Sequence, residues 1–181
     1  MAAVKKENTF TLKTENKNRN TATAVVVLAV AAVLLAIDQM LKYFVLRDLR
    51  PVGTVTVIPG LLELTYVENT GAAFGLFKQV MWLVVAVTVV ATVAIIVLLF
   101  RYKRHSFFSY TTAALLMAGG IGNLIDRVLN GEVVDYINLL FMRFAVFNFA
   151  DICVCVGVAL WVLVIFLEES HSGNADAPKE P

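Results

Sequence analysis

Four long apolar stretches alternate with polar segments and predict the main elements of the chain. They cover residues 23–46, 80–100, 107–126 and 151–167. A membrane-spanning helix needs about 20 mostly apolar residues, because each residue adds about 1.5 Å along a path of about 30 Å. The first three stretches reach this length, and the fourth is at the short limit. The pattern therefore predicts four transmembrane helices.

A second pattern lies between the first two apolar stretches. The segments TVTV (54–57) and LLELTYVE (61–68) flank Pro59 and Gly60, an arrangement typical of a hairpin or small curved sheet. We therefore expect an all-α polytopic membrane protein with a small sheet on its outer face. Its membrane domain should cover residues 23–167, with a β-rich outer segment at about 48–70. The polar ends, 1–22 and 168–181, lack periodicity and predict disordered tails.

Composition agrees with a membrane protein. Hydrophobic residues make up 59% of the chain and charged residues 16%, whereas a soluble domain has about 45–50% and about 25%. The net charge of +1 indicates no nucleic-acid partner. Cys153 and Cys155 lie two positions apart in an apolar stretch, where a helix would point them to nearly opposite sides. They predict buried small side chains and no disulfide framework.

Basic residues set the expected orientation. Five precede the first apolar stretch, and the link between the second and third is RYKRH (101–105). Because Lys and Arg favour cytoplasmic segments, both termini should be cytoplasmic, with 43–79 and 127–150 outside. The first stretch predicts an uncleaved anchor, since Asp38, Gln39 and Lys42 follow its apolar run where a signal peptide would have small residues.

Carboxylates near the outer ends of the predicted helices are the candidate functional groups. At about 1.5 Å per residue, Asp38 lies about 24 Å and Asp126 about 30 Å above the cytoplasmic ends, and Asp151 opens the last helix at the outer face. Ionisable residues in membrane spans are usually functional. All serines and histidines fall near the cytoplasmic side. This excludes Ser-His, Cys-His and histidine-zinc sites at the outer face, and leaves carboxylates, amides, Lys42 and Arg127.

Two neighbouring carboxylates can share a proton and act as base and acid on water, without metal or cofactor. The outer acids are Asp126, Asp135 and Asp151, with Asp38 deeper, and residue chemistry alone leaves the choice of pair open. Asn123 with Asp126, and Asn148 with Asp151, have the same i, i+3 spacing and share a helix face. Each amide could orient a carboxylate or a substrate carbonyl.

Simpler interpretations stand beside this one. Asp38 and Lys42 could form only an i, i+4 ion pair, Asn148 could cap a helix, and Asp151 could complement its dipole. Asp126 with Arg127 could anchor the chain at the interface between membrane and water. The glycines at positions 119, 120 and 122 could serve only close helix packing. A proton- or ion-coupled carrier is the rival function, although its site should lie near the midplane. A structural assembly factor would leave the amide–acid spacing without a purpose.

Five segments in order then carry a resemblance: DQMLK (38–42), NTGAAFG (69–75), GGIGNLIDR (119–127), VVDYI (133–137) and FNFAD (147–151). The chain resembles the bacterial lipoprotein signal peptidases, or type II signal peptidases. The resemblance implies four transmembrane helices, a small outer sheet and an aspartyl endopeptidase of the inner membrane. Such an enzyme cleaves prolipoproteins before a lipid-modified cysteine.

Carried over residue by residue, the resemblance implies a catalytic pair of Asp135 and Asp151. It also implies a supporting set of residues: Asp38, Lys42, Asn69, Gly71, Asn123, Asp126, Arg127 and Asn148. A carboxylate beside its own guanidinium tends to stay ionised, which makes Asp126 the poorer proton-sharing partner. We expect a diacylglyceryl-modified prolipoprotein substrate, contact with membrane lipid, no nucleic acid, no metal or other cofactor, and a monomer.

Overall fold

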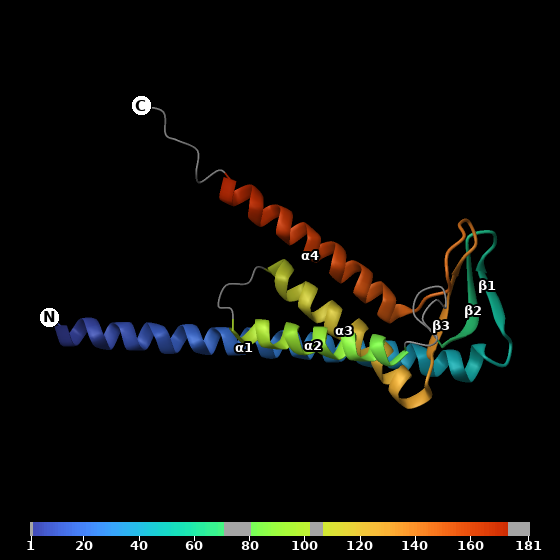
Figure 1. Cartoon of the computed structure of the whole chain (residues 1–181), viewed down its shortest axis with the longest axis horizontal. Coiled ribbons are helices and arrows are strands. Elements are labelled where there is room, and N and C mark those ends of the chain that lie inside the picture. Colours follow the sequence, from blue (N-terminus) through green and yellow to red (C-terminus); the bar gives the residue numbers. More distant parts are fainter. Residues whose placement is uncertain (1, 71–80, 102–106, 174–181) are drawn as a thin grey trace, which may run out of the picture.

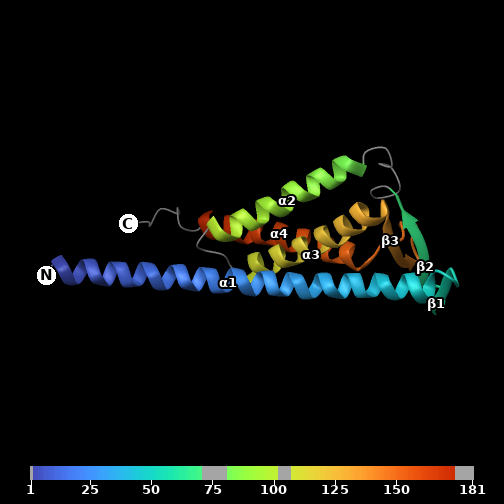
Figure 2. The same ribbon diagram turned by 90° about the horizontal axis from the view of Figure 1, so that it is seen from below.

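The structure, a computed structural model, describes residues 2–70, 81–101 and 107–173. Within them, four long helices form the body of the molecule: α1 (Ala2–Phe44), α2 (Met81–Arg101), α3 (Phe107–Asn130) and α4 (Phe149–Gly173). A short π-helix, η1 (Val45–Leu49), continues α1. Helix α3 packs against α1, α2 and α4, and is therefore the centre of the helical body (Figures 1 and 2).

Small side chains let the helices approach closely. Ala113, Ala114 and Met117 of α3 pack against Val27 and Ala31 of α1. Between α3 and α4, a Cβ atom added at Gly119 would collide with the backbone oxygen of Ala150 and the side chain of Val154. The predicted role of this glycine in helix packing is confirmed, because only a residue without a side chain permits the contact.

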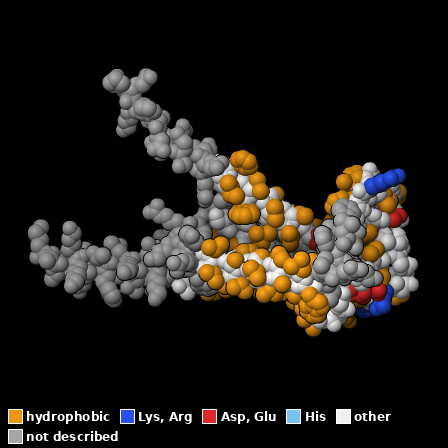
Figure 3. Space-filling model, in the orientation of Figure 1, with side chains coloured by type: hydrophobic (Ala, Val, Ile, Leu, Met, Phe, Trp, Pro, Cys, Tyr) orange, Lys and Arg blue, Asp and Glu red, His pale blue; other side chains and the backbone are white. Residues whose placement is uncertain are grey.

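The helical surface is apolar. Two helical segments, Thr21–Leu49 and Phe107–Asn130, are long and apolar enough to cross a membrane, while the apolar parts of α2 and α4 are shorter, Trp82–Leu98 and Phe149–Leu163. Large apolar side chains are exposed along α1, α2 and α4. Figure 3 shows hydrophobic side chains over the helical body, with the coloured charged side chains on this face near the sheet. Among the described residues there are thus two candidate spans, and the count of four stays a prediction.

A three-stranded antiparallel sheet lies across one end of the helices (Figure 1). Its strands are β1 (Thr54–Ile58), β2 (Leu62–Asn69) and β3 (Val133–Leu139), in the order β1-β2-β3. The predicted hairpin of the first two is confirmed, with Gly60 at φ 73° in the turn between them. The third strand was not predicted, since VVDYI is buried at every position except the last and lacks the alternation of a half-exposed strand.

The ends of the chain differ from the predicted tails. Helix α1 begins at Ala2 and therefore includes residues 2–22 of the segment expected to form a disordered tail. No glycine or proline occurs in α1 to break a helix that the apolar span already propagates. Helix α4 continues past residue 167 to Gly173. The rest of the predicted tail, 174–181, lies outside the described residues.

Candidate active site

The site begins on α1, where Asp38 and Lys42 lie one helical turn apart. Lys42 Nζ is 2.9 Å from Asp38 Oδ2 and 2.8 Å from Asp126 Oδ2 on α3. All three side chains are buried. The predicted i, i+4 ion pair is therefore confirmed. Lys42 also contacts a second carboxylate, that of Asp126. Sequence spacing does not reveal this contact, because α1 and α3 meet only in the folded chain.

Two further groups complete this ion cluster. A Cβ atom added at Gly122 would lie 2.5 Å from Asp38 Oδ2, so this glycine leaves the space that the carboxylate occupies. The side-chain nitrogen of Gln39 lies 3.1 Å from Asp38 Oδ2 and 3.3 Å from Asp126 Oδ1. Sequence reasoning missed Gln39 as a site residue. Its only signal was its place beside Asp38 in DQMLK.

Hydrogen bonds connect the first turn of α4 to Asp38 of this cluster and join Asn148 to Asp151 within the turn itself. The backbone N–H of Ala150 donates to Asp38 Oδ1 at 3.0 Å. Asp151 N–H donates to Asn148 Oδ1 at 3.0 Å, and Asn148 N–H donates back to Asp151 Oδ2 at 3.1 Å. This reciprocal arrangement satisfies two backbone donors at the helix start. The interpretation of Asn148 as a cap is confirmed, and the cap also fixes the Asp151 carboxylate.

Asn123 connects the ion cluster to Asp151. Its Oδ1 accepts hydrogen bonds from Lys42 Nζ and Asn148 Nδ2, both at 3.0 Å. Its amide nitrogen must therefore face the other way, where it donates to Asp151 Oδ1 at 2.7 Å. Each predicted Asn/Asp pair on a helix face is brought into one network, and Lys42 sets the direction of the amide that holds Asp151.

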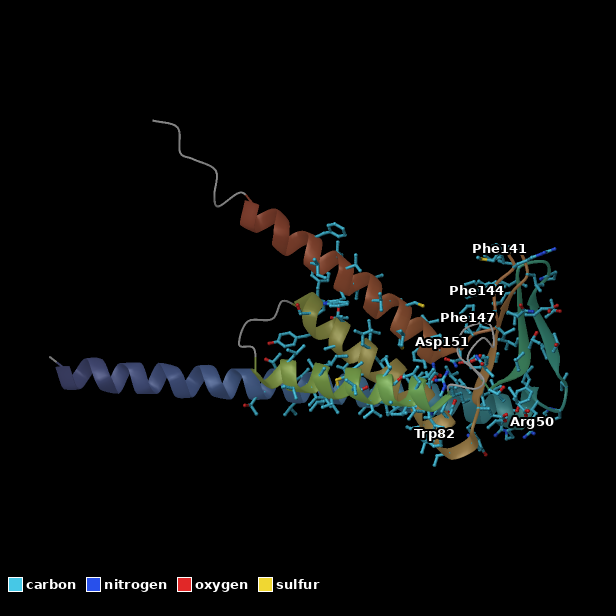
Figure 4. All side chains as sticks on the ribbon, in the orientation of Figure 1. Arg50, Trp82, Phe141, Phe144, Phe147 and Asp151 are labelled. Carbon is cyan, nitrogen blue, oxygen red and sulfur yellow. The ribbon has the colours of Figure 1, made fainter. Side chains whose placement is uncertain are left out.

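Asp135 enters the network from β3. It is 2% exposed, and its two oxygens accept from Asn69 Nδ2 at 2.8 Å and Asn148 Nδ2 at 2.7 Å. Burial, with a smaller contribution from the charge of Asp151, outweighs the opposing effect of the two amides and raises the pKa of Asp135 to about 6. Asn148 thus contacts both carboxylates of the predicted pair, and Figure 4 shows Asp151 where α4 meets the sheet.

Arg127 lies at the same level. Its guanidinium donates to the backbone oxygen of Asn123 at 3.2 Å, and its charge interacts with those of Asp151, Asp135 and Asp126. Sequence adjacency singled out Asp126 as its partner, whereas the structure also brings Arg127 to the predicted catalytic pair. Gly71, the remaining predicted site residue, lies outside the described residues.

The arrangement concentrates carboxylates and amides at one place. In the described parts of the chain, no group of three or more His, Cys, Asp or Glu side chains is placed to hold a metal ion. Two carboxylates joined through one amide are suited to moving a proton to and from a water molecule. Fold and site together define a helical membrane protein with a buried acid–amide centre at one end.

Comparison with known proteins gives the family. Residues 30–167 match the model of signal peptidase (SPase) II, and the chain belongs to this family. It is 41% identical to the lipoprotein signal peptidase of Caldanaerobacter subterraneus over 76% of this chain and 94% of that one. The corresponding protein of Streptococcus pneumoniae is 37% identical over 80% and 94%. The resemblance drawn from the five segments is confirmed, and the chain is a peptidase.

Solved structures agree. A bacterial membrane enzyme determined by the in meso method at 2.3 Å resolution matches with a TM-score of 0.75 and 30% identity, covering 86% of this chain and 94% of that one. A second, at 1.9 Å resolution, has a TM-score of 0.70 and 31% identity, over 77% and 92%. The fold described above is therefore that of a membrane enzyme.

Proposed function

We propose that this chain removes signal peptides from prolipoproteins as an aspartyl endopeptidase, cleaving before the diacylglyceryl-modified cysteine. Asp135 and Asp151 are the catalytic pair. The observation that carries the proposal is the position of Asn148, whose side chain bonds Asp135 and whose backbone bonds Asp151. One residue thereby holds two carboxylates from different elements at the same place. The family membership supplies the reaction class.

The proposed reaction uses one shared proton. We assign that proton to Asp135, because burial raises its pKa to about 6. Asp151, held by Asn123 and Asn148, accepts a proton from water as the water oxygen attacks the carbonyl carbon before the lipidated cysteine. Asp135 donates its proton to the developing oxyanion. Collapse of the intermediate breaks the C–N bond as the proton on Asp151 passes to the leaving amine nitrogen. A hydroxyl proton of the intermediate returns to Asp135, which leaves a carboxylic acid product and restores the shared proton.

Asp126 is the alternative acid, and its surroundings favour a supporting role. Its Oδ2 is paired with Lys42 at 2.8 Å, and its Oδ1 faces Gln39. A carboxylate held by a buried ammonium is tied to positioning rather than free to exchange a proton with water. We therefore assign Asp126, Asp38 and Lys42 to holding α1, α3 and α4 in register beneath the pair.

We further propose that all four helices cross the inner membrane, with both termini in the cytoplasm and the pair at the outer face. The exposed apolar surface of α2 and α4 supports their crossing despite their short apolar cores. The basic segments before the first span and at residues 101–105 support the orientation. Reporter fusions at Pro59 and Glu132 should behave as external. Cytoplasmic behaviour of either fusion contradicts this orientation.

The catalytic assignment is tested with Asp135→Asn, Asp151→Asn and Asp126→Asn proteins, purified in detergent and assayed for prolipoprotein processing. Either change in the pair should abolish turnover while the substrate still binds, because both members are needed as acid and base. Asp126→Asn should retain some activity. Cleavage by Asp135→Asn beside a folded but inactive Asp126→Asn protein moves the catalytic role to Asp126. Each assay is repeated with a chelator, which should leave wild-type activity intact.

A further inference from the structure

The connection between β3 and α4 exposes large apolar side chains at the sheet end of the molecule. We call residues 140–147 the aromatic loop. Phe141 is 60% exposed and Phe144 is 47% exposed, and Leu140 and Met142 are also exposed. An apolar cluster of this kind on a surface loop indicates a contact with another molecule or with lipid.

The aromatic loop has a defined shape. Phe147 and Ile137 exchange two backbone hydrogen bonds, of 3.1 and 2.7 Å, so the chain folds back against β3. The N–H of Leu140 donates to the backbone oxygen of Leu61 at 3.0 Å, which ties the other end of the loop to the β1–β2 hairpin. The rings of Phe144 and Phe147 meet edge to face with centroids 5.7 Å apart. The exposed rings are therefore presented by a supported backbone.

The phenylalanines of the aromatic loop lie along one side of the sheet. In Figure 4, Phe141, Phe144 and Phe147 follow one another from the tip of the sheet down to Asp151, along the side of the sheet that is turned toward the helices. This part of the sheet extends sideways beyond the start of α4 (Figure 1). Below it, the first turns of α4 expose Ile152 and Val156. The apolar surface of the helix thus continues toward the aromatic loop.

We propose that the aromatic loop enters the outer leaflet of the membrane and contacts the acyl chains of phospholipids beside α4. The side of the loop that carries the phenylalanines faces the volume that lipid fills when α4 crosses the bilayer. Aromatic side chains are favoured at this boundary. Arg143, exposed within the loop, is long enough to keep its guanidinium among the headgroup phosphates. A second soluble protein would have to reach this surface through the headgroup layer.

The contact of the aromatic loop with lipid fixes the depth of the sheet relative to the membrane. Phe147 lies next to Asn148, and β3 carries Asp135, so a loop held in the leaflet holds both parts of the catalytic site at the boundary of acyl chains and headgroups. The inference rests on the membrane orientation proposed above and is independent of which acids are catalytic.

Depth-dependent quenching of tryptophan fluorescence tests the inference on the full chain. Trp82→Phe/Trp161→Phe serves as the background, into which Phe141→Trp or Phe144→Trp is introduced. The proteins are reconstituted in phosphatidylcholine vesicles whose acyl chains carry bromine either near the headgroup or near the methyl end. Each introduced tryptophan should emit at shorter wavelength than in water and lose more fluorescence to the shallow bromine than to the deep one.

Two controls separate the possible failures. Thr56→Trp in β1, the strand farthest from the helices in Figure 1, should be quenched by aqueous acrylamide and not by bromine. A protein that keeps only Trp161, about 18 Å along α4 from its start, should be quenched most by the deep bromine. If Trp161 is not quenched, the proposed crossing of α4 fails. If Trp161 is quenched but positions 141 and 144 respond to acrylamide, or to neither quencher, the loop lies in water or against protein and the inference is wrong.

Discussion

The side-chain nitrogen of Asn148 lies 2.7 Å from Oδ1 of Asp135, across the junction between α4 and β3. Asn148 is fully buried, and the same nitrogen also lies 3.0 Å from Asn123 Oδ1. Its backbone N–H and side-chain oxygen are bonded to Asp151. Every polar group of Asn148 except its backbone carbonyl is therefore hydrogen-bonded to another residue of the site. Replacement of Asn148 is the most direct test of this network.

Asn148→Ala should lower prolipoprotein cleavage by about 100-fold, since a displacement of either carboxylate by about 1 Å is enough for such a loss. The protein should remain folded with a stability loss of about 1–3 kcal/mol from buried groups left without partners. Processing assays and thermal unfolding in detergent measure the two effects. Asn138→Ala, in the same strand as Asp135 but half-buried, is the matched control and should be nearly neutral. Near-normal cleavage by a folded Asn148→Ala protein contradicts the proposed role.

Lys42→Met should be strongly destabilising, because it leaves Asp38 and Asp126 as buried carboxylates without a cation. Breaking a buried ion pair in this way costs about 3–5 kcal/mol. Thermal unfolding should show the loss, and activity should fall with it because Asn123 loses the donor that sets its orientation. Arg47→Met removes a cation from an exposed ion pair on the same segment and should have no measurable effect. Equal behaviour of the two variants argues against a structural role for the buried cluster.

The stability of the protein should depend on pH through Asp135. Its pKa of about 6 lies above the ordinary value of 3.8, so the folded state holds the proton more tightly than the unfolded state. The stabilisation by that proton is complete below about pH 4 and is lost as the pH rises through 6, a change of about 3 kcal/mol. Asp135→Asn lacks this titration, so its Tm relative to wild type should increase from pH 4 to pH 7.

Asp48→Asn is the control for this measurement. The Asp48 carboxylate is exposed and paired with the exposed Arg47 guanidinium at 2.7 Å, and an exposed ion pair contributes little to stability. The Tm difference between this variant and wild type should therefore be flat over the same pH range. A flat difference for Asp135→Asn as well shows that burial does not perturb Asp135.

Replacement of Gly120 or Gly122 of α3 by alanine should change the stability of the protein in opposite directions. A Cβ atom at position 122 would lie 2.5 Å from Asp38 Oδ2, so Gly122→Ala displaces the ion cluster and should reduce both Tm and cleavage. A Cβ atom at position 120 would meet Thr88 Cγ2 at 3.4 Å, an ordinary contact. Gly120→Ala should therefore raise stability, by up to about 1 kcal/mol, because alanine favours helix. Thermal unfolding decides, and a stable, active Gly122→Ala protein shows that the cluster tolerates displacement.

What the sequence alone determined are the features that depend on neighbours along the chain. The helical parts of the four apolar stretches follow from hydrophobic content over one continuous segment. The Asp38–Lys42 pair and the Asn148–Asp151 cap join residues three or four positions apart, where helix geometry fixes the distance. The five ordered segments were specific enough to give the family. None of these depends on how distant elements meet.

Only the tertiary structure decided which partners those residues find beyond their own element. Lys42 meets Asp126 because α1 crosses α3 where Gly122 leaves room. Asp135 meets Asn69 because β3 pairs with β2 in a register that shifts between Leu64 and Val67, where a β-bulge or irregularity interrupts the ladder. The sequence of β3 does not specify that register, since it is buried on both faces over its first four residues and lacks a polar alternation to fix it. Helix crossing and strand register are set by packing between elements, and that packing placed Asp135 beside Asn148.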